Sequence, residues 1–528
     1  MKRLRGEVTL FLLLVSVLIF SLIAVTLEGA RSACLDYLTR QAADSGIRSV
    51  FAAYDTELMK LSGLLAVRGR EGDSLSWTET AETYLRKYLE PGGGCGEGDR
   101  VRLSNLELTE TRSVFLTDDE GKVFADAVLA YMKSAGMSAL IRDLLDRFSA
   151  LGENAEDLKN TTEGILSEDL SLKSVLKNYK DLKSSAEELL EQMRREAEEA
   201  GGTGSGEAAD EAAAGQEEAA ETEPEEEVPP ETLSLGNSLK ELLEKLKQLD
   251  QQGILMLLLQ DSEISTRSWE EADLPSKLSR EEKRRSSGFA KADYSFGEKL
   301  LLTEYALSNC GCYTERKGGG MQYELEYILC GGRTDKDALE NTASRIMLLR
   351  TCFNVLFLVA DEQKMTEIQA AAAALCAALQ LPIPLDLASG LILALWAIVE
   401  AVADLRSLMK GGTVPVIKTA ADWKMSVISL ENAAGETGGS RLGLNYEDYL
   451  RLMLWLESGE TFSYRLMDVL QLRMREQNAE FLCREYMVYA AFDLKVTAEY
   501  LYLPFPTTKR LTGAGEGRTY SLSAAWGY

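Results

Sequence analysis

Residues 8–27 read VTLFLLLVSVLIFSLIAVTL, an unbroken run without a charged side chain. An α-helix of about 20 residues is about 30 Å long, which matches the hydrocarbon core of a bilayer. Lys2, Arg3 and Arg5 precede the run, and basic residues beside a span stay in the cytoplasm. The sequence therefore predicts a single-pass membrane anchor over residues 1–28, with the N-terminus cytoplasmic and the bulk of the chain extracellular.

Two other interpretations of the N-terminus stay open. A cleaved signal peptide usually has an apolar region of about 7–15 residues and a small-x-small site after it. The run here is longer, and LEGAR at residues 27–31 is a poor cleavage context. A lipoprotein would use Cys34, although Arg31 stands where such sites carry an aliphatic residue. No second span is expected, because the apolar run at residues 387–399 has the length of a buried core helix.

The composition excludes several classes of function. Lys and Arg total 57 against 84 Asp and Glu, so the 528-residue chain has a net charge of −27. Nucleic-acid binding needs basic surfaces, and no nucleic-acid partner is expected. The chain has no histidine, which removes Ser-His-Asp and Cys-His catalysis and His-ligated metals. The 45% apolar content still provides material for sizeable cores.

The patterns downstream of the span predict an α+β fold. Apolar residues at near-helical spacing continue from residue 29 to about 67, so the transmembrane helix should continue into a long helix that docks on the ectodomain. Further helices are predicted near residues 77–89, 296–307, 336–358, 362–379, 385–410, 446–456 and 462–477. Strands are predicted within residues 101–116, 322–330, 414–418, 481–503 and 519–528, with a turn at residues 118–121.

Two heptad seams flank a strongly acidic stretch. Apolar residues alternate at spacings of three and four in residues 172–193 and again in residues 235–249, which is typical of coiled-coil helices. Between them, residues 196–231 hold 14 acidic side chains and no Lys or Arg. Such a segment buries too little apolar surface to offset its ordering entropy. The sequence predicts an antiparallel helical hairpin with a disordered acidic linker at its tip, which acts as a spacer.

The resulting domain prediction has five parts. Its boundaries are residues 1–28 for the tail and anchor, 29–165 for an N-terminal ectodomain part, 166–195 and 233–252 for the hairpin arms, 196–232 for the acidic linker, and 253–528 for a C-terminal α+β core.

The best candidates for chemistry are Glu400 and Asp404, one turn apart on a predicted helix, with Arg406 just beyond them. Two facing carboxylates can act as acid and base or hold a cation. The alternative is a buried ionic cluster that pins the apolar helix to Arg345, Arg350 or Lys418. We expect the second, because no further ligand set is visible and buried charges must be paired.

The cysteines indicate no metal site. Cys310, Cys312 and Cys330 flank one predicted strand, so a disulfide among them and free buried thiols are both compatible with the sequence. Zinc needs four ligands at matched spacing, and the sequence has no Cys-x-x-Cys and no histidine. We therefore expect no metal, no cofactor and no small-molecule ligand.

The N-terminus resembles the minor pseudopilins of Tad (Flp) pilus systems. Those proteins have a short basic leader ending in Gly, then a hydrophobic helix with a Glu near its outer end; here Gly6, Glu7 and Glu28 match, while Phe11 departs from the Glu that pilins usually carry. The resemblance implies leader processing between Gly6 and Glu7. The rest of the chain resembles an uncharacterised family of single-span proteins of clostridial and related Gram-positive bacteria, often encoded beside Tad pilus genes. The matching stretches are residues 54–64, 116–118, 323–327, 348–354, 394–404, 412–418, 446–450 and 467–468.

These observations together favour a non-enzymatic, membrane-anchored extracellular protein. The resemblance implies that it is an accessory or minor component of a Tad/Flp-type pilus or secretion assembly, with proteins of that assembly as partners. Two alternatives remain: an extracellular carboxylate-dependent hydrolase using Glu400 and Asp404, and a cell-envelope adhesin or sensor.

Overall fold

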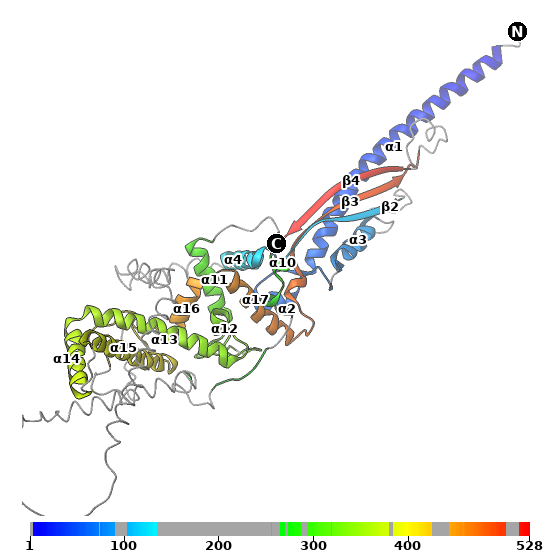
Figure 1. Ribbon diagram of the computed structural model, residues 1–528. Coiled ribbons are helices and arrows are strands. Elements are labelled where there is room, and N and C mark those ends of the chain that lie inside the picture. The colour runs from blue at the N-terminus through cyan, green and yellow to red at the C-terminus, as the bar shows by residue number, and fades with distance from the viewer. Residues whose placement is uncertain are drawn as a thin grey trace, which may run out of the picture.

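The structure is a computed structural model, and it describes residues 4–72, 74–89, 103–134, 255, 264–269, 273–286, 294–317, 319–379, 384–424, 443–457, 459–502 and 517–528. The molecule is elongated, with the N-terminus at one end and a helical lobe at the other (Figure 1). A small antiparallel sheet and a helical core lie between them. This arrangement confirms the predicted α+β class.

Helix α1 (Leu4–Ala52) has two halves with different surroundings. Its side chains from residue 8 to 27 are almost all exposed, whereas its second half packs on the sheet and on α3 (Ser76–Leu89). The buried stripe of the second half recurs at helical spacing: Leu35, Thr39, Ala42, Ala43, Ile47, Val50 and Phe51. The long helix expected from the sequence is therefore present, and it ends at residue 52 rather than near residue 67.

Chain segments from both ends of the sequence build the sheet. Strand β3 (Tyr486–Glu499) pairs antiparallel with β2 (Leu103–Phe115) on one side and with β4 (Gly517–Gly527) on the other. The short β1 (Val67–Arg68) pairs with the first residues of β3. The strands predicted within residues 101–116, 481–503 and 519–528 are confirmed. Strands β2 and β3 therefore bring described residues from the first and last quarters of the chain into one sheet.

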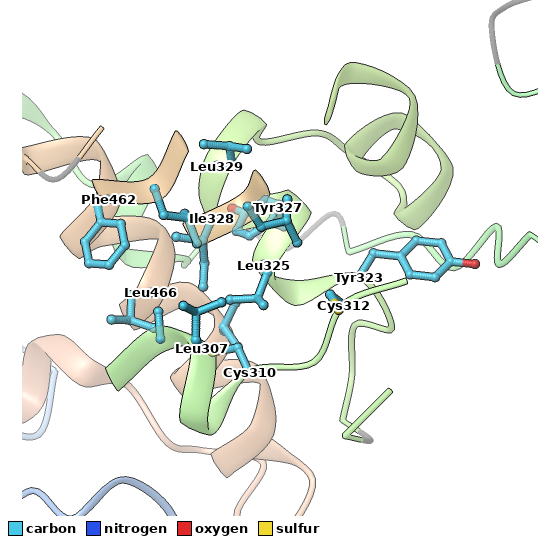
Figure 2. Close-up of a cluster of buried hydrophobic side chains, with 14 of the residues drawn as sticks. Leu307, Cys310, Cys312, Tyr323, Leu325, Tyr327, Ile328, Leu329, Phe462 and Leu466 are labelled. Atoms are coloured by element: carbon cyan, nitrogen blue, oxygen red, sulfur yellow. The ribbon is translucent and has the colours of Figure 1, made fainter. Parts of the chain in front are cut away.

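Short helices surround the largest core. They are α2 (Thr56–Ser62), α4 (Lys122–Ser134), α10 (Arg280–Lys283), α11 (Phe296–Asn309), α12 (Glu324–Cys330), α16 (Tyr446–Glu457) and α17 (Glu460–Arg475), with single 3₁₀ turns at Asp119–Gly121, Pro275–Lys277 and Cys483–Glu485. Figure 2 shows α12 at the centre, with Leu325 and Ile328 among side chains of α11 and α17. Every residue of α12 from 324 to 329 is buried.

The distal lobe consists of α13 (Asp335–Ala360), α14 (Glu362–Leu379) and α15 (Leu385–Met409). Thr334 caps α13: its hydroxyl accepts a hydrogen bond from the Asp337 N–H, and the Asp337 carboxylate accepts one from the Thr334 N–H. Trp396 and Leu358 lie in the apolar centre of the lobe. These helices closely follow the predicted ranges, because long periodic apolar patterns specify helices well.

Two strand predictions are wrong. Residues 322–330 alternate polar and apolar residues, yet residues 324–330 form helix α12. Alternation predicts a strand only if the polar residues face solvent, whereas Glu324 and Glu326 are buried with partners. Residues 414–418 also form no strand; Val414 makes an isolated bridge to Leu444. The predicted hairpin arms and the acidic linker lie outside the described residues.

Candidate functional site

Three described helices are long and apolar enough to cross a membrane, and they differ in burial. The apolar window of α1, which begins at Val8, has mean hydropathy 3.0 and is 0% buried. The window of α15 is 72% buried and that of α13 is 33% buried. The burial of α15 fits the expectation that its apolar run is a core helix, and α1 has both the composition and the exposure of a membrane anchor.

The exposed half of α1 joins the folded part of the chain at Glu28. This carboxylate is only 5% exposed and forms an ion pair with Arg31 at 2.7 Å. Its other oxygen accepts hydrogen bonds from the backbone N–H groups of Leu501 and Tyr502, at 3.2 and 2.8 Å. Immediately after the apolar run, Glu28 therefore binds the helix to the residues that follow β3.

One turn further along α1, a second group of contacts continues this junction. The Ser32 hydroxyl lies 2.8 Å from the Tyr520 hydroxyl and accepts a hydrogen bond from Arg518 at 2.6 Å. Leu35 packs with Ala498 and Tyr520 in a small apolar cluster. We call Glu28, Ser32, Tyr502, Arg518 and Tyr520 the collar. Together these contacts fix the direction of α1 relative to the sheet.

The residues implied in leader processing lie at the start of α1. Gly6 and Glu7 belong to its first helical turns, and their side chains are outside the described part of the structure. The structure therefore places both residues next to the apolar run.

The second candidate cluster lies at the base of the distal lobe. Glu400 and Asp404 are fully buried on α15. Arg350 of α13 binds Asp404 through two N–H groups, at 2.9 and 3.1 Å from Oδ2. Lys418 binds Glu400 and lies 2.7 Å from Oδ1 of Asp404. Two carboxylates thus face two cations, and the buried cluster is formally neutral.

Backbone groups complete the coordination of these charges. Arg350 donates to the carbonyl oxygens of Pro415 and Val416, at 2.9 and 2.8 Å, and the Lys424 N–H donates to Glu400 at 3.1 Å. The cluster therefore ties the segment that follows α15 to α13 and α15. Carboxylates without solvent access, each held by a cation, are poorly suited to acid–base catalysis on a substrate.

The two other basic residues named from the sequence have different places. Arg345 pairs with Glu457 of α16, so it binds outside the cluster of Glu400 and Asp404. Arg406 lies half-buried in the last turn of α15, where positive charge interacts favourably with the helix dipole.

The three central cysteines are free thiols in the structure. Cys310 and Cys312 are buried and Cys330 is half-buried. Burial raises the pKa of all three thiols, because the apolar surroundings disfavour the thiolate. A raised pKa lowers the thiolate fraction, so these cysteines have the environment of inert structural thiols.

Sequence reasoning missed a set of buried carboxylates around α12. Glu324 binds Arg473 and accepts the Gly311 N–H at 2.7 Å. Glu326 accepts hydrogen bonds from the Tyr313 N–H and the Tyr446 hydroxyl, at 2.8 and 2.9 Å, through the same oxygen. Desolvation raises the pKa of Glu326 to about 7.

A similar arrangement surrounds Asp468 on α17. Its carboxylate accepts hydrogen bonds from the Tyr327 hydroxyl at 2.7 Å and from the Ser276 N–H at 2.9 Å, and burial raises its pKa. The sequence contains many tyrosines and many acidic residues, and this was the available signal for such sites. It does not show which tyrosine pairs with which carboxylate, because the partners are far apart in the sequence.

A cavity of about 20 Å³ lies between α2, α11 and α17, beside Cys310 and Arg473, and it has space for a single water. No group of three or more Cys, Asp or Glu side chains that could hold a metal ion occurs in the described ranges.

These features define a class: an α+β protein with an exposed apolar N-terminal helix fixed to its sheet, and with its candidate acid–base pair buried in ion pairs. Residues 234–498 match the model of the family of unknown function DUF5702, and the chain belongs to this family. The matched part runs through α11–α17 to β3 and leaves α1, β2 and β4 outside it. Neither a curated protein nor a solved structure matches the chain.

Proposed function

We propose that the protein is a non-enzymatic, membrane-anchored surface protein that acts as an accessory or minor component of a Tad/Flp-type pilus or secretion assembly. The apolar half of α1 lies in the membrane, the basic N-terminal residues are cytoplasmic, and the folded part is extracellular. The observation that carries the proposal is the junction at Glu28, where an exposed apolar helix is fixed directly to the sheet.

The junction suits a protein that transmits force or holds a fixed position. Helix α1 runs without a break from Leu4 to Ala52, and its second half is buried against α3 and the sheet. A continuous helix packed in this way cannot swivel where it leaves the membrane. This geometry supports a mechanical role for the anchor, and the pilus or secretion assembly is the partner that the pseudopilin-like N-terminus implies.

The hydrolase alternative receives no support from Glu400 and Asp404. An extracellular hydrolase would need both carboxylates in an open polar cleft, and both are 0% exposed and paired with Lys418 or Arg350. An adhesin or sensor could bind a cationic partner through the acidic linker, and residues 196–232 lie outside the described part of the chain.

Two measurements test the proposal. Before digestion, a C-terminally tagged chain should stay in the membrane fraction after alkaline carbonate extraction. Protease added to intact protoplasts should then remove the tag. A protected tag would contradict the extracellular orientation. Crosslinking of intact envelopes followed by purification of the tagged chain should recover pilus or secretion proteins; a variant with residues 1–28 deleted is the control. Recovery of the same proteins by this variant, or of none by the full chain, would refute the assembly role.

A further inference from the structure

The apolar run of α1 and the folded ectodomain are separated by no spacer. Leu27 is 46% exposed, whereas Glu28 is 5% exposed, Ser32 is 9% exposed and Leu35 is 3% exposed. Tertiary packing therefore begins at the first residue after the uncharged run. The medium that surrounds the end of the apolar run must therefore also contact the folded residues that pack against Glu28 and Ser32.

The depth of this point follows from helix geometry. Residues 8–27 match the hydrocarbon thickness of about 30 Å, and the headgroup layer adds about 5–7 Å on each side. At about 1.5 Å per residue, that layer covers about the next three to five residues of the helix. Glu28 and Ser32 fall within it. Their hydrogen bonds bring Leu501, Tyr502 and Arg518 to the same level.

The chemistry of this end of the sheet suits the headgroup layer. The side chain of Arg518 is exposed, and its guanidinium lies over the Tyr520 ring, 5.4 Å from the centroid. Tyr502, whose backbone N–H binds Glu28, has a side chain that is 39% exposed. Arginine binds phosphate oxygens through paired N–H groups, and tyrosines gather at membrane interfaces. Ala498, Arg518 and Tyr520 share one face of the sheet. Because side chains alternate along a strand, the acidic Glu499 lies on the opposite face.

We infer that the collar lies in the headgroup layer of the outer leaflet of the cell membrane and that Arg518 binds a lipid phosphate there. The inference rests on the proposed anchoring by α1, and the occupant of the collar is the bilayer itself. Two attachments, the helix and the strand end, then hold the ectodomain at a fixed tilt. An anchor helix alone would leave this tilt free.

The test uses the full chain in phospholipid nanodiscs with a photoreactive residue. Tyr502→p-benzoylphenylalanine places the group in the collar. Trp526→p-benzoylphenylalanine is the matched control, since it is also an aromatic, 36% exposed, and lies eight residues beyond Arg518 on β4, about 26 Å away. After irradiation, mass spectrometry counts lipid adducts. We expect a several-fold higher yield of lipid adducts at position 502.

A second arm tests the phosphate. Arg518→Gln should lower the adduct yield at position 502 several-fold in phospholipid nanodiscs, and Arg518→Lys should retain most of it. In nanodiscs of a phosphate-free galactolipid, Arg518→Gln should change little. An equal effect of Arg518→Gln in both lipids would overturn the phosphate contact.

The remaining outcomes separate this inference from the proposed function. If the chain floats with the nanodiscs but positions 502 and 526 give equal lipid adducts, the collar is wrong and the anchor stands. If the chain does not enter nanodiscs, the anchor and the collar both fail. If position 502 gives chiefly chain-to-chain adducts, the occupant is a second copy and the lipid assignment is overturned.

Discussion

Replacing Lys418 by methionine should strongly destabilise the distal lobe. Lys418 is 1% exposed at its side chain and binds both Glu400 and Asp404. Methionine has a similar length and no charge, so the substitution keeps the packing and removes one of the two cations. The cluster of two carboxylates and two cations would then hold an uncompensated negative charge in the protein interior.

The magnitude follows from which group loses its partner. Asp404 keeps the two hydrogen bonds from Arg350, so the cost falls mainly on Glu400. Breaking a buried ion pair by removing one partner costs about 3–5 kcal/mol, because the other charge stays buried. The double variant Lys418→Met with Glu400→Gln removes both charges of the pair. We expect it to recover a large part of this loss.

Urea unfolding of the full chain in detergent, followed by tryptophan fluorescence, measures the effect. Trp396 and Trp423 lie edge-to-face in the lobe, with ring centroids 5.5 Å apart, and report on its packing. Lys410→Met is the control, because Lys410 is exposed at the end of α15. A loss for Lys418→Met as small as the control's would refute the buried-pair reasoning. So would a double variant less stable than the single one.

Three further predictions concern other parts of the molecule. Burial raises the pKa of Glu326 to about 7, so the folded chain binds this proton more tightly than the unfolded chain. The contribution of Glu326 to the free energy of unfolding is therefore largest below its ordinary pKa of 4.5 and is lost as the pH rises through 7. Glu326→Gln should flatten that fall in melting temperature, and an unchanged pH profile would contradict it. Glu28→Ala should speed hydrogen exchange at the amides of Leu501 and Tyr502 and should lower the free energy of unfolding by about 1.5–3 kcal/mol. Asp36→Ala, which removes an exposed ion pair with Arg40, is the control and should change neither. Maleimide should label exposed Cys34 in the native chain and reach buried Cys310 only after unfolding, and rapid native labelling of Cys310, read by mass spectrometry, would disprove its inert environment.

Local patterns in the sequence determined the long helices and the strands within residues 101–116, 481–503 and 519–528. The uncharged run at residues 8–27 and the apolar stripes of α13, α14 and α15 repeat at helical spacing, and such patterns need no knowledge of distant partners. The same reasoning named Arg345, Arg350 and Lys418 as candidate partners for Glu400 and Asp404, and the structure pairs the last two with them. A charged residue on an apolar helix needs a counter-charge, and few basic residues lie near enough in sequence.

Only the tertiary structure decided which distant segments meet. Strand β3 lies between β2 and β4, and Glu28 meets the amides of Leu501 and Tyr502, because long-range pairing leaves no local trace in the sequence. Helix α12 shows the same limit. Its alternating pattern predicted a strand, but Arg473 of α17 and Tyr446 of α16 hydrogen-bond to its buried carboxylates. These partners offset the desolvation cost of the buried carboxylates. The polar residues of the segment therefore need not face solvent, and the alternating pattern no longer requires a strand.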